Sequence, residues 1–179
     1  MELLEVTYLY EHSLAGILVV ETLKPCRVQQ IFVEDVGIFE QVRPMRPQKV
    51  AQFRQRFERG HLCYGAYLDD RCAHFSWVQT QGLHYIESAR LTWSLKPGEF
   101  FIYDCRTADW ARGYRLYPFV LAHILEEFRR QAFKKGLIYT TQSNLASQKG
   151  IQRAGFTLRQ KMRLLRIGSL ALRVPGLPR

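Results

Sequence analysis

The stretch Glu99-Phe-Phe-Ile-Tyr-Asp-Cys-Arg-Thr107, with the turn at Ala108–Tyr117 and the segment after it, decides the fold. Alternate residues of Glu99–Thr107 fall on opposite faces of an extended chain, which predicts a strand. Pro118 suits the first turn of a helix, where its missing N–H has no partner. Apolar residues then recur every three or four positions up to Phe133. A second strand is predicted at Leu137–Thr141, and a right-handed crossover places it parallel and adjacent to the first.

The chain on either side of this unit predicts hairpins and two more helices. Strands are predicted at Val28–Val33, Phe39–Arg43, Leu62–Leu68, Ala73–Thr80, Leu83–Glu87 and Thr157–Ile167. Helices are predicted over Gln48–Arg59 and from Ser143-Asn144 to Arg153. This order of elements predicts an α+β fold in which helices cover both faces of a mixed, largely antiparallel sheet.

The two ends of the chain carry weaker patterns. Residues 1–24 fit a short helix with Leu3, Leu4, Tyr8 and Leu9 on one face, or a strand at Ile17–Val20. We therefore expect an N-terminal extension of undecided structure over 1–26, one domain over 27–168 and a basic tail over 169–179.

Composition bounds the class of protein. The 179 residues are 47% hydrophobic and 13% aromatic, which excludes a disordered or low-complexity chain. The apolar run Leu14–Val20 follows the acidic residues Glu2, Glu5 and Glu11, where a signal peptide would be basic. We expect a soluble, cytoplasmic protein without a membrane span. The four cysteines form no C-x-x-C pair and the five histidines show no ligand spacing, so free thiols and no metal site are expected.

Positive charge is concentrated in the last third of the chain. The whole chain has 26 basic and 16 acidic residues, and residues 128–179 hold 12 of the basic ones and none of the acidic ones. Such a bias suits an anionic partner, which could be nucleotide phosphates, nucleic acid, an acidic carrier protein or an acidic substrate. A solvated basic face that aids solubility explains it equally well.

The turn after Thr107 combines a helix N-terminus with basic side chains. The N-terminus offers unpaired N–H groups and partial positive charge to an anion. Gly113 allows close approach of the backbone to a phosphate. Arg106, Arg112 and Arg115 add guanidinium groups that bind phosphate oxygens in a fork. The pattern predicts a phosphate site, although an ordinary turn has the same composition.

From about Arg27 to Ile167 the sequence resembles the GNAT acyltransferase superfamily. The resemblance is carried by the strand and turn above, by Ser143-Asn-Leu-Ala-Ser147 and by Arg153-Ala-Gly-Phe156. In that family a strand, a glycine-containing loop and a helix bind acyl-coenzyme A. An Asn and a Ser after the next strand begin a further helix, and a Gly-Phe pair closes it.

Three positions depart from the family pattern. Of the loop positions Trp110, Gly113 and Arg115, only the glycine matches, so the Arg115 side chain either points away from the donor or binds its phosphate. The family's general-acid tyrosine is replaced by Ile151. Nearby tyrosines, including Tyr117, are interpreted as packing residues.

The resemblance implies an N-acyltransferase that moves an acyl group, acetyl in the simplest case, from acyl-coenzyme A to the amine of a small molecule or peptide. Glu99 is the implied base, with Asp104 in reserve. The implied donor-binding residues are Cys105, Arg106, Thr107, Arg112, Gly113, Tyr114, Arg115, Asn144 and Ser147. The alternatives are an acyl carrier protein as donor, or a non-catalytic module that binds an acidic partner or, less expectedly, nucleic acid.

Overall fold

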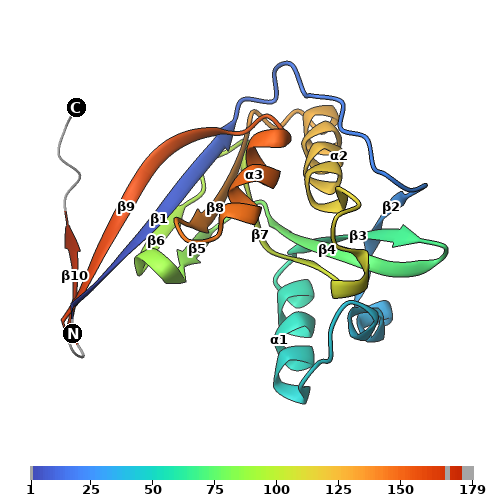
Figure 1. Ribbon diagram of the computed structural model, residues 1–179, viewed down its shortest axis with the longest axis horizontal. Helices are drawn as coiled ribbons and strands as arrows, with labels where there is room; N and C mark the ends of the chain where they lie inside the picture. Colours follow the sequence, from blue (N-terminus) through green and yellow to red (C-terminus); the bar gives the residue numbers. More distant parts are fainter. Residues whose placement is uncertain (1, 168–169, 175–179) are drawn as a thin grey trace.

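The computed structural model describes residues 2–167 and 170–174 of the chain (Figure 1). Its main sheet has eight strands in the order β10-β9-β1-β8-β7-β4-β3-β2, and β5 and β6 form a separate ribbon. The strands are β1 Glu2–His12, β2 Arg27–Ile31, β3 Leu62–Leu68, β4 Arg71–Gln79, β5 Leu83–Ile86, β6 Leu91–Ser94, β7 Glu99–Thr107, β8 Lys135–Thr141, β9 Thr157–Ile167 and β10 Leu170–Val174. The helices are α1 Pro47–Glu58, α2 Leu116–Arg130 and α3 Leu145–Arg153, with 3₁₀ segments η1 Val33–Gln41, η2 Glu87–Ala89 and η3 Asp109–Ala111.

β7 and β8 are parallel neighbours, as the sequence predicts, and every other strand pair in the described residues is antiparallel. Their register runs from Glu99 opposite Lys135 to Ile102 opposite Ile138 and stops there. β7 continues to Thr107. The two strands are therefore not paired with each other over their carboxyl-terminal halves, which is where a ligand can enter a sheet.

Helices cover both faces of the sheet, which confirms the predicted fold class. Figure 1 shows α2 and α3 on one side and α1 on the other. The side chains of β3 and β4 alternate accordingly because successive residues of a strand point to opposite faces. Tyr64 and Val78 pack in the core with α2, whereas Phe75 and Trp77 pack around Phe53 of α1.

The N-terminal residues, which the sequence leaves undecided, form a central strand. β1 lies between β8 and β9, and its Leu9 and Tyr10 are fully buried. The first half of the extension expected over 1–26 therefore completes the sheet. The expected domain bounds stay a prediction. Residues 17–20 form no strand. Of the tail expected over 169–179, β10 pairs with β9, while 169 and 175–179 lie outside the described residues.

The strand predicted at Phe39–Arg43 is wrong. Phe39 belongs to the 3₁₀ segment η1, where it is fully buried between Phe53, Phe75 and Trp77 at centroid distances of 4.7 to 5.9 Å. One large aromatic anchor is enough to hold this segment on the sheet, so no strand pairing is required. The sequence analysis also misses β6, which is only four residues long.

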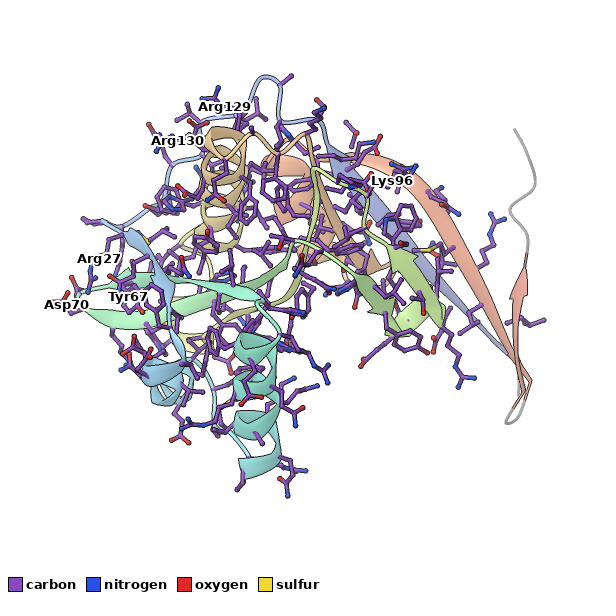
Figure 2. The ribbon with its side chains drawn as sticks, turned by 180° about the vertical axis from the view of Figure 1, so that it is seen from behind. Arg27, Tyr67, Asp70, Lys96, Arg129 and Arg130 are labelled. Atoms are coloured by element: carbon purple, nitrogen blue, oxygen red, sulfur yellow. The ribbon has the colours of Figure 1, made fainter. Side chains whose placement is uncertain are left out.

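The outer edge of the sheet lies away from the open ends of β7 and β8. There Arg27 pairs with Asp70 at 2.8 Å and lies 4.6 Å from the ring centre of Tyr67, and Figure 2 shows the three side chains together at one end of the molecule. All four cysteines are free, as expected, and Cys63 and Cys72 are buried. No helix in the described residues is long and apolar enough to cross a membrane.

Candidate active site

A β-bulge opens the sheet beyond the last β7–β8 pair. The register between β7 and β4 shifts between Phe75 and Trp77, and Asp104 takes a left-handed conformation with φ of 44°. A bulge inserts one extra residue and re-aims the side chains around it. As a result Tyr103 and Asp104 both contact Arg56, on the α1 side of the sheet. A cavity of about 840 Å³ lies at this opening and is lined by residues of β7, β8, α2, α3 and η2.

The turn before α2 presents a row of free amides to this cavity. Gly113 has φ of 90° and Arg115 has φ of 63°, and α2 begins at the next residue. Within the described chain, the N–H groups of residues 113–117 make no hydrogen bond to a protein acceptor. A Cβ added at Gly113 would meet no atom within 4 Å, so the backbone there faces open space. Free backbone amides in such a concave arrangement are of the kind that binds anions such as phosphate.

The N-terminus of α3 forms the second wall on this side. Asn144 caps the helix, its Oδ1 accepting from the Ser147 N–H at 3.0 Å. The Ser147 hydroxyl lies 3.3 Å from the Tyr117 hydroxyl of α2. Gly150 permits this approach, since a Cβ there would come within 2.5 Å of the Tyr117 ring. Burial, and next the nearby Cys105, hold the pKa of Tyr117 well above its usual value, so the phenol stays protonated.

Lys149 and Arg153 also line the cavity, and the sequence analysis does not single them out as donor-binding residues. They are four residues apart on α3 and so share one face of the helix, which is the sequence signal that could have found them.

Other basic residues of the last third are paired with acidic residues. Glu126 binds Arg129 and Arg130, which Figure 2 shows at the outer end of α2, and Glu11 binds Lys135 and Arg159. The charge bias of the sequence is therefore partly neutralised in the fold.

The cavity brings together eight of the ten predicted site residues: Cys105, Arg106, Thr107, Arg112, Gly113, Arg115, Asn144 and Ser147. Tyr114 turns away from it. The Tyr114 ring packs against Lys24, and its carbonyl accepts from the Leu23 N–H at 3.1 Å. Arg112 lines the cavity but pairs with Asp109 at 2.7 Å. Ile151, at the family's general-acid position, is fully buried in the core.

Glu99 is not brought to the cavity. It is 8% exposed, at the end of β7 where that strand still pairs with β8, and its Oε2 accepts from the Lys96 N–H at 3.2 Å. The spacing to Arg112 suggests a base, but the bulge at Asp104 and the length of β7 separate Glu99 from the opening. Its catalytic role stays a prediction, and the geometry favours another carboxylate.

Asp104, the reserve base, is surrounded by cations. Arg56 lies 2.7 Å and Lys49 3.2 Å from its Oδ2, and Arg106 lies 3.6 Å from its Oδ1. Burial alone would raise the pKa of Asp104, but Arg56 and Lys49 outweigh it and hold this pKa below its usual value. A carboxylate so stabilised is a poor proton acceptor.

Glu87 is the carboxylate that the sequence analysis misses. It opens η2, is exposed, lines the cavity on the face opposite α2 and α3, and makes no ion pair among the described residues. Its neighbour Ser88 is fixed by a hydrogen bond from the Thr7 hydroxyl at 2.7 Å. Nothing in its local sequence marks Glu87, because only the pairing of β1 with β8 brings η2 to the opening.

Solved structures of known proteins share this architecture. A GNAT-family acetyltransferase from Colwellia psychrerythraea matches with a TM-score of 0.65 at 16% identity, over 98% of this chain and 57% of that one. An IAA acetyltransferase from Bacillus cereus matches with a TM-score of 0.55 at 16% identity, over 76% of this chain and 79% of that one. The chain has the GNAT acetyltransferase fold.

The GNAT fold is thus established by structure and not by sequence. No family model and no curated protein matches the sequence. A functionally unknown protein from Staphylococcus epidermidis also has this architecture, with a TM-score of 0.56 at 10% identity over 92% of this chain. The chain spans 62% of the length of that protein and 57% of the Colwellia enzyme.

Proposed function

We propose that the protein is an N-acyltransferase that moves an acyl group from acyl-coenzyme A to an amine within the opening between β7 and β8. The observation that carries this proposal is the coincidence of two features in one cavity. The strands stop pairing after Ile102 and Ile138, and the adjacent loop offers free amides at residues 113–117. A long phosphorylated thioester needs both a space between the strands for its arm and a group of hydrogen-bond donors for its phosphates.

Different residues of the chain bind the pyrophosphate and the thioester arm of the donor. The amides of residues 113–117 hold the pyrophosphate, with Arg115, Lys149 and Arg153 adding charge. Main-chain groups of Tyr103–Thr107 on the edge that no longer pairs with β8 line the thioester arm. The donor supplies an activated acyl carbon. Because both reactants are held in one slot, positioning alone can lower the barrier by roughly 7–11 kcal/mol.

Proton transfer is assigned to two residues on opposite faces of the sheet. The amine nitrogen bonds to the acyl carbon, the carbon–sulfur bond breaks, and the amine loses a proton to Glu87, directly or through water. Tyr117, which lines the cavity, donates a proton to the leaving sulfur. This assignment gives the attacking nitrogen and the leaving sulfur separate proton-transfer groups.

Melting curves with candidate donors test donor use. At a hundredfold excess over its dissociation constant, coenzyme A or acetyl-coenzyme A should stabilise the protein by roughly 2.7 kcal/mol, which is on the order of 5–10 °C in Tm. Long-chain acyl-coenzyme A and acyl carrier protein complete the panel. A shift with acyl carrier protein alone would move the donor assignment to the carrier, and no shift with any of the four would favour a non-catalytic module.

Arg115→Gly separates the backbone conformation of this loop position from the contribution of its side chain to donor binding. A left-handed conformation costs a residue with a side chain roughly 1–2 kcal/mol, which glycine avoids, so we expect a higher Tm for the free variant. Coenzyme A binding, measured by calorimetry, should weaken because a guanidinium is lost. Tighter binding by the variant would show that the side chain obstructs the donor.

A further inference from the structure

A basic hollow lies on the α1 side of the sheet, separate from the donor cavity. It has a volume of about 760 Å³. Its lining residues are Arg43, Pro44, Arg46, Gln48, Lys49 and Gln52, which include three cations and no acidic residue. A volume of this order suits a small molecule or part of one.

Two of the three cations that line this hollow have no acidic partner in the described part of the chain. Arg43 and Arg46 are exposed and pair with no carboxylate in the described part of the chain. Lys49 bonds to Gln52 Oε1 at 2.8 Å and shares Asp104 with Arg56. An anion that entered the hollow would therefore gain charge-assisted hydrogen bonds from Arg43 and Arg46 without displacing a carboxylate from either.

The hollow adjoins the active-site opening through one ion pair. Lys49 lines the hollow and Asp104 lines the cavity, and 3.2 Å separates the Lys49 Nζ from the Asp104 Oδ2. Around that single carboxylate stand three cations, Lys49, Arg56 and Arg106. This side of the opening thus carries a net positive charge, which repels a polycationic acceptor and attracts an anionic group.

The other side of the opening carries the opposite sign. Glu87 stands there, and Tyr139 lines the same cavity. Burial raises the pKa of Tyr139 to about 12, with further raising contributions from Glu87 and Asp104 and a lowering one from Arg56. Tyr139 is thus within electrostatic reach of both sides. A molecule with an amine at one end and an anion at the other matches this arrangement.

We propose that the acceptor is a small amine that also carries a phosphate or carboxylate group, with the anion bound by Arg46, Lys49 and Arg106 and the amine facing Glu87. This inference rests on the proposed acyl transfer, which it deepens by naming the class of acceptor. Arg43 contributes at the rim of the hollow. Simple polyamines, which carry no anion, are then disfavoured as acceptors.

Calorimetric titration of the coenzyme A-saturated protein tests the proposal with two matched pairs of amines. The first pair is O-phosphoethanolamine and ethanolamine, and the second is glycine and glycinamide. In at least one pair, the dissociation constant of the anionic member should be about tenfold lower than that of the neutral member. Hydrogen bonds to a charged group are stronger than those between neutral groups by a free energy of about that size. The two pairs distinguish phosphate from carboxylate recognition. Equal binding of both members in both pairs, or no measurable binding of any of the four, would overturn the proposal.

Two charge-removing variants locate the site. Arg46→Gln should weaken binding of the preferred anion several-fold, whereas Arg54→Gln, which removes the same charge from an exposed position of α1 outside the hollow, should not. Equal losses in both variants would mean unspecific attraction and would also overturn the proposal. Melting temperatures check that both variants fold.

Acetyl transfer to the same four amines, measured in parallel, keeps the two proposals apart. If the anionic amines bind selectively but none is acetylated, the acyltransfer proposal fails while the anion site stands. If neutral amines are acetylated as fast as their anionic partners, the enzyme stands and the proposed acceptor class fails.

Discussion

Glu87→Gln is expected to lower kcat for acyl transfer by roughly 10²- to 10⁴-fold at neutral pH, the range that a positioned base contributes. A primary amine has a pKa near ~10 and is mostly protonated at neutral pH, so it must lose a proton before or during attack. Glu87 is the cavity carboxylate that makes no ion pair in the described chain, whereas Asp104 is held by three cations. The amide of glutamine keeps the shape of the side chain and removes its basicity.

Glu99→Gln is the matched control for this experiment. It makes the same chemical change at a buried carboxylate outside the cavity, so kcat should stay near the wild-type value. Neither substitution should alter the dissociation constant of coenzyme A. The rate loss in Glu87→Gln should shrink as pH rises and free amine accumulates. A wild-type kcat in Glu87→Gln combined with a slow Glu99→Gln would return the role of base to Glu99.

The free energy of unfolding is expected to fall steeply as pH drops from about 6.5 toward 4. Burial lowers the pKa of His74 to about 3 and, with nearby arginines and other charged groups contributing less, the pKa values of His61 and His84 to about 4. Unfolded histidines titrate near 6.5. Below that pH the unfolded chain takes up protons that the native state refuses, so stability is present above 6.5 and is lost as pH falls. Each histidine adds up to about 1.4 kcal/mol per pH unit to the slope of the free energy of unfolding against pH.

His74 is the clearest single contributor. It is 1% exposed, and its two ring nitrogens lie 2.7 Å from the Thr107 hydroxyl and 2.9 Å from the Ser76 hydroxyl. Urea unfolding of the wild type and His74→Gln between pH 7 and pH 4 would measure the effect. The variant should be less stable at pH 7 and should lose stability less steeply on acidification. A wild-type stability that is flat over this range would contradict the burial of these neutral rings.

The sequence predicts the parts of the fold that local chemistry determines. The bounds of β7 and β9 are confirmed residue for residue because alternation and flanking turns define them. Pro47 and Gly60 bracket α1, and of the two residues at which α3 is predicted to begin, Ser143 and Asn144, it is Asn144 that caps the helix. The turn before α2 is located because glycine and arginine stand between a strand and a helix, a signal that needs no tertiary information, and its binding of phosphate stays a prediction.

The remaining features depend on contacts between distant residues. β1 is ambiguous in sequence because its place is set by neighbours more than a hundred positions away, with Thr7 opposite Thr141 and Met162. The bulge at Asp104 has no local signature, and it determines which β7 side chains meet α1. For the same reason spacing along the chain points to Glu99, while the fold brings Glu87 to the opening.

The most direct test of the account is a crystal structure of the protein with coenzyme A. We expect the pyrophosphate oxygens within hydrogen-bonding distance of the amide nitrogens of residues 113–117, and the pantetheine arm between β7 and β8 beyond Ile102 and Ile138. A complex in which those amides bind protein groups, with coenzyme A elsewhere on the surface or absent, would contradict the assignment of this cavity as the donor site.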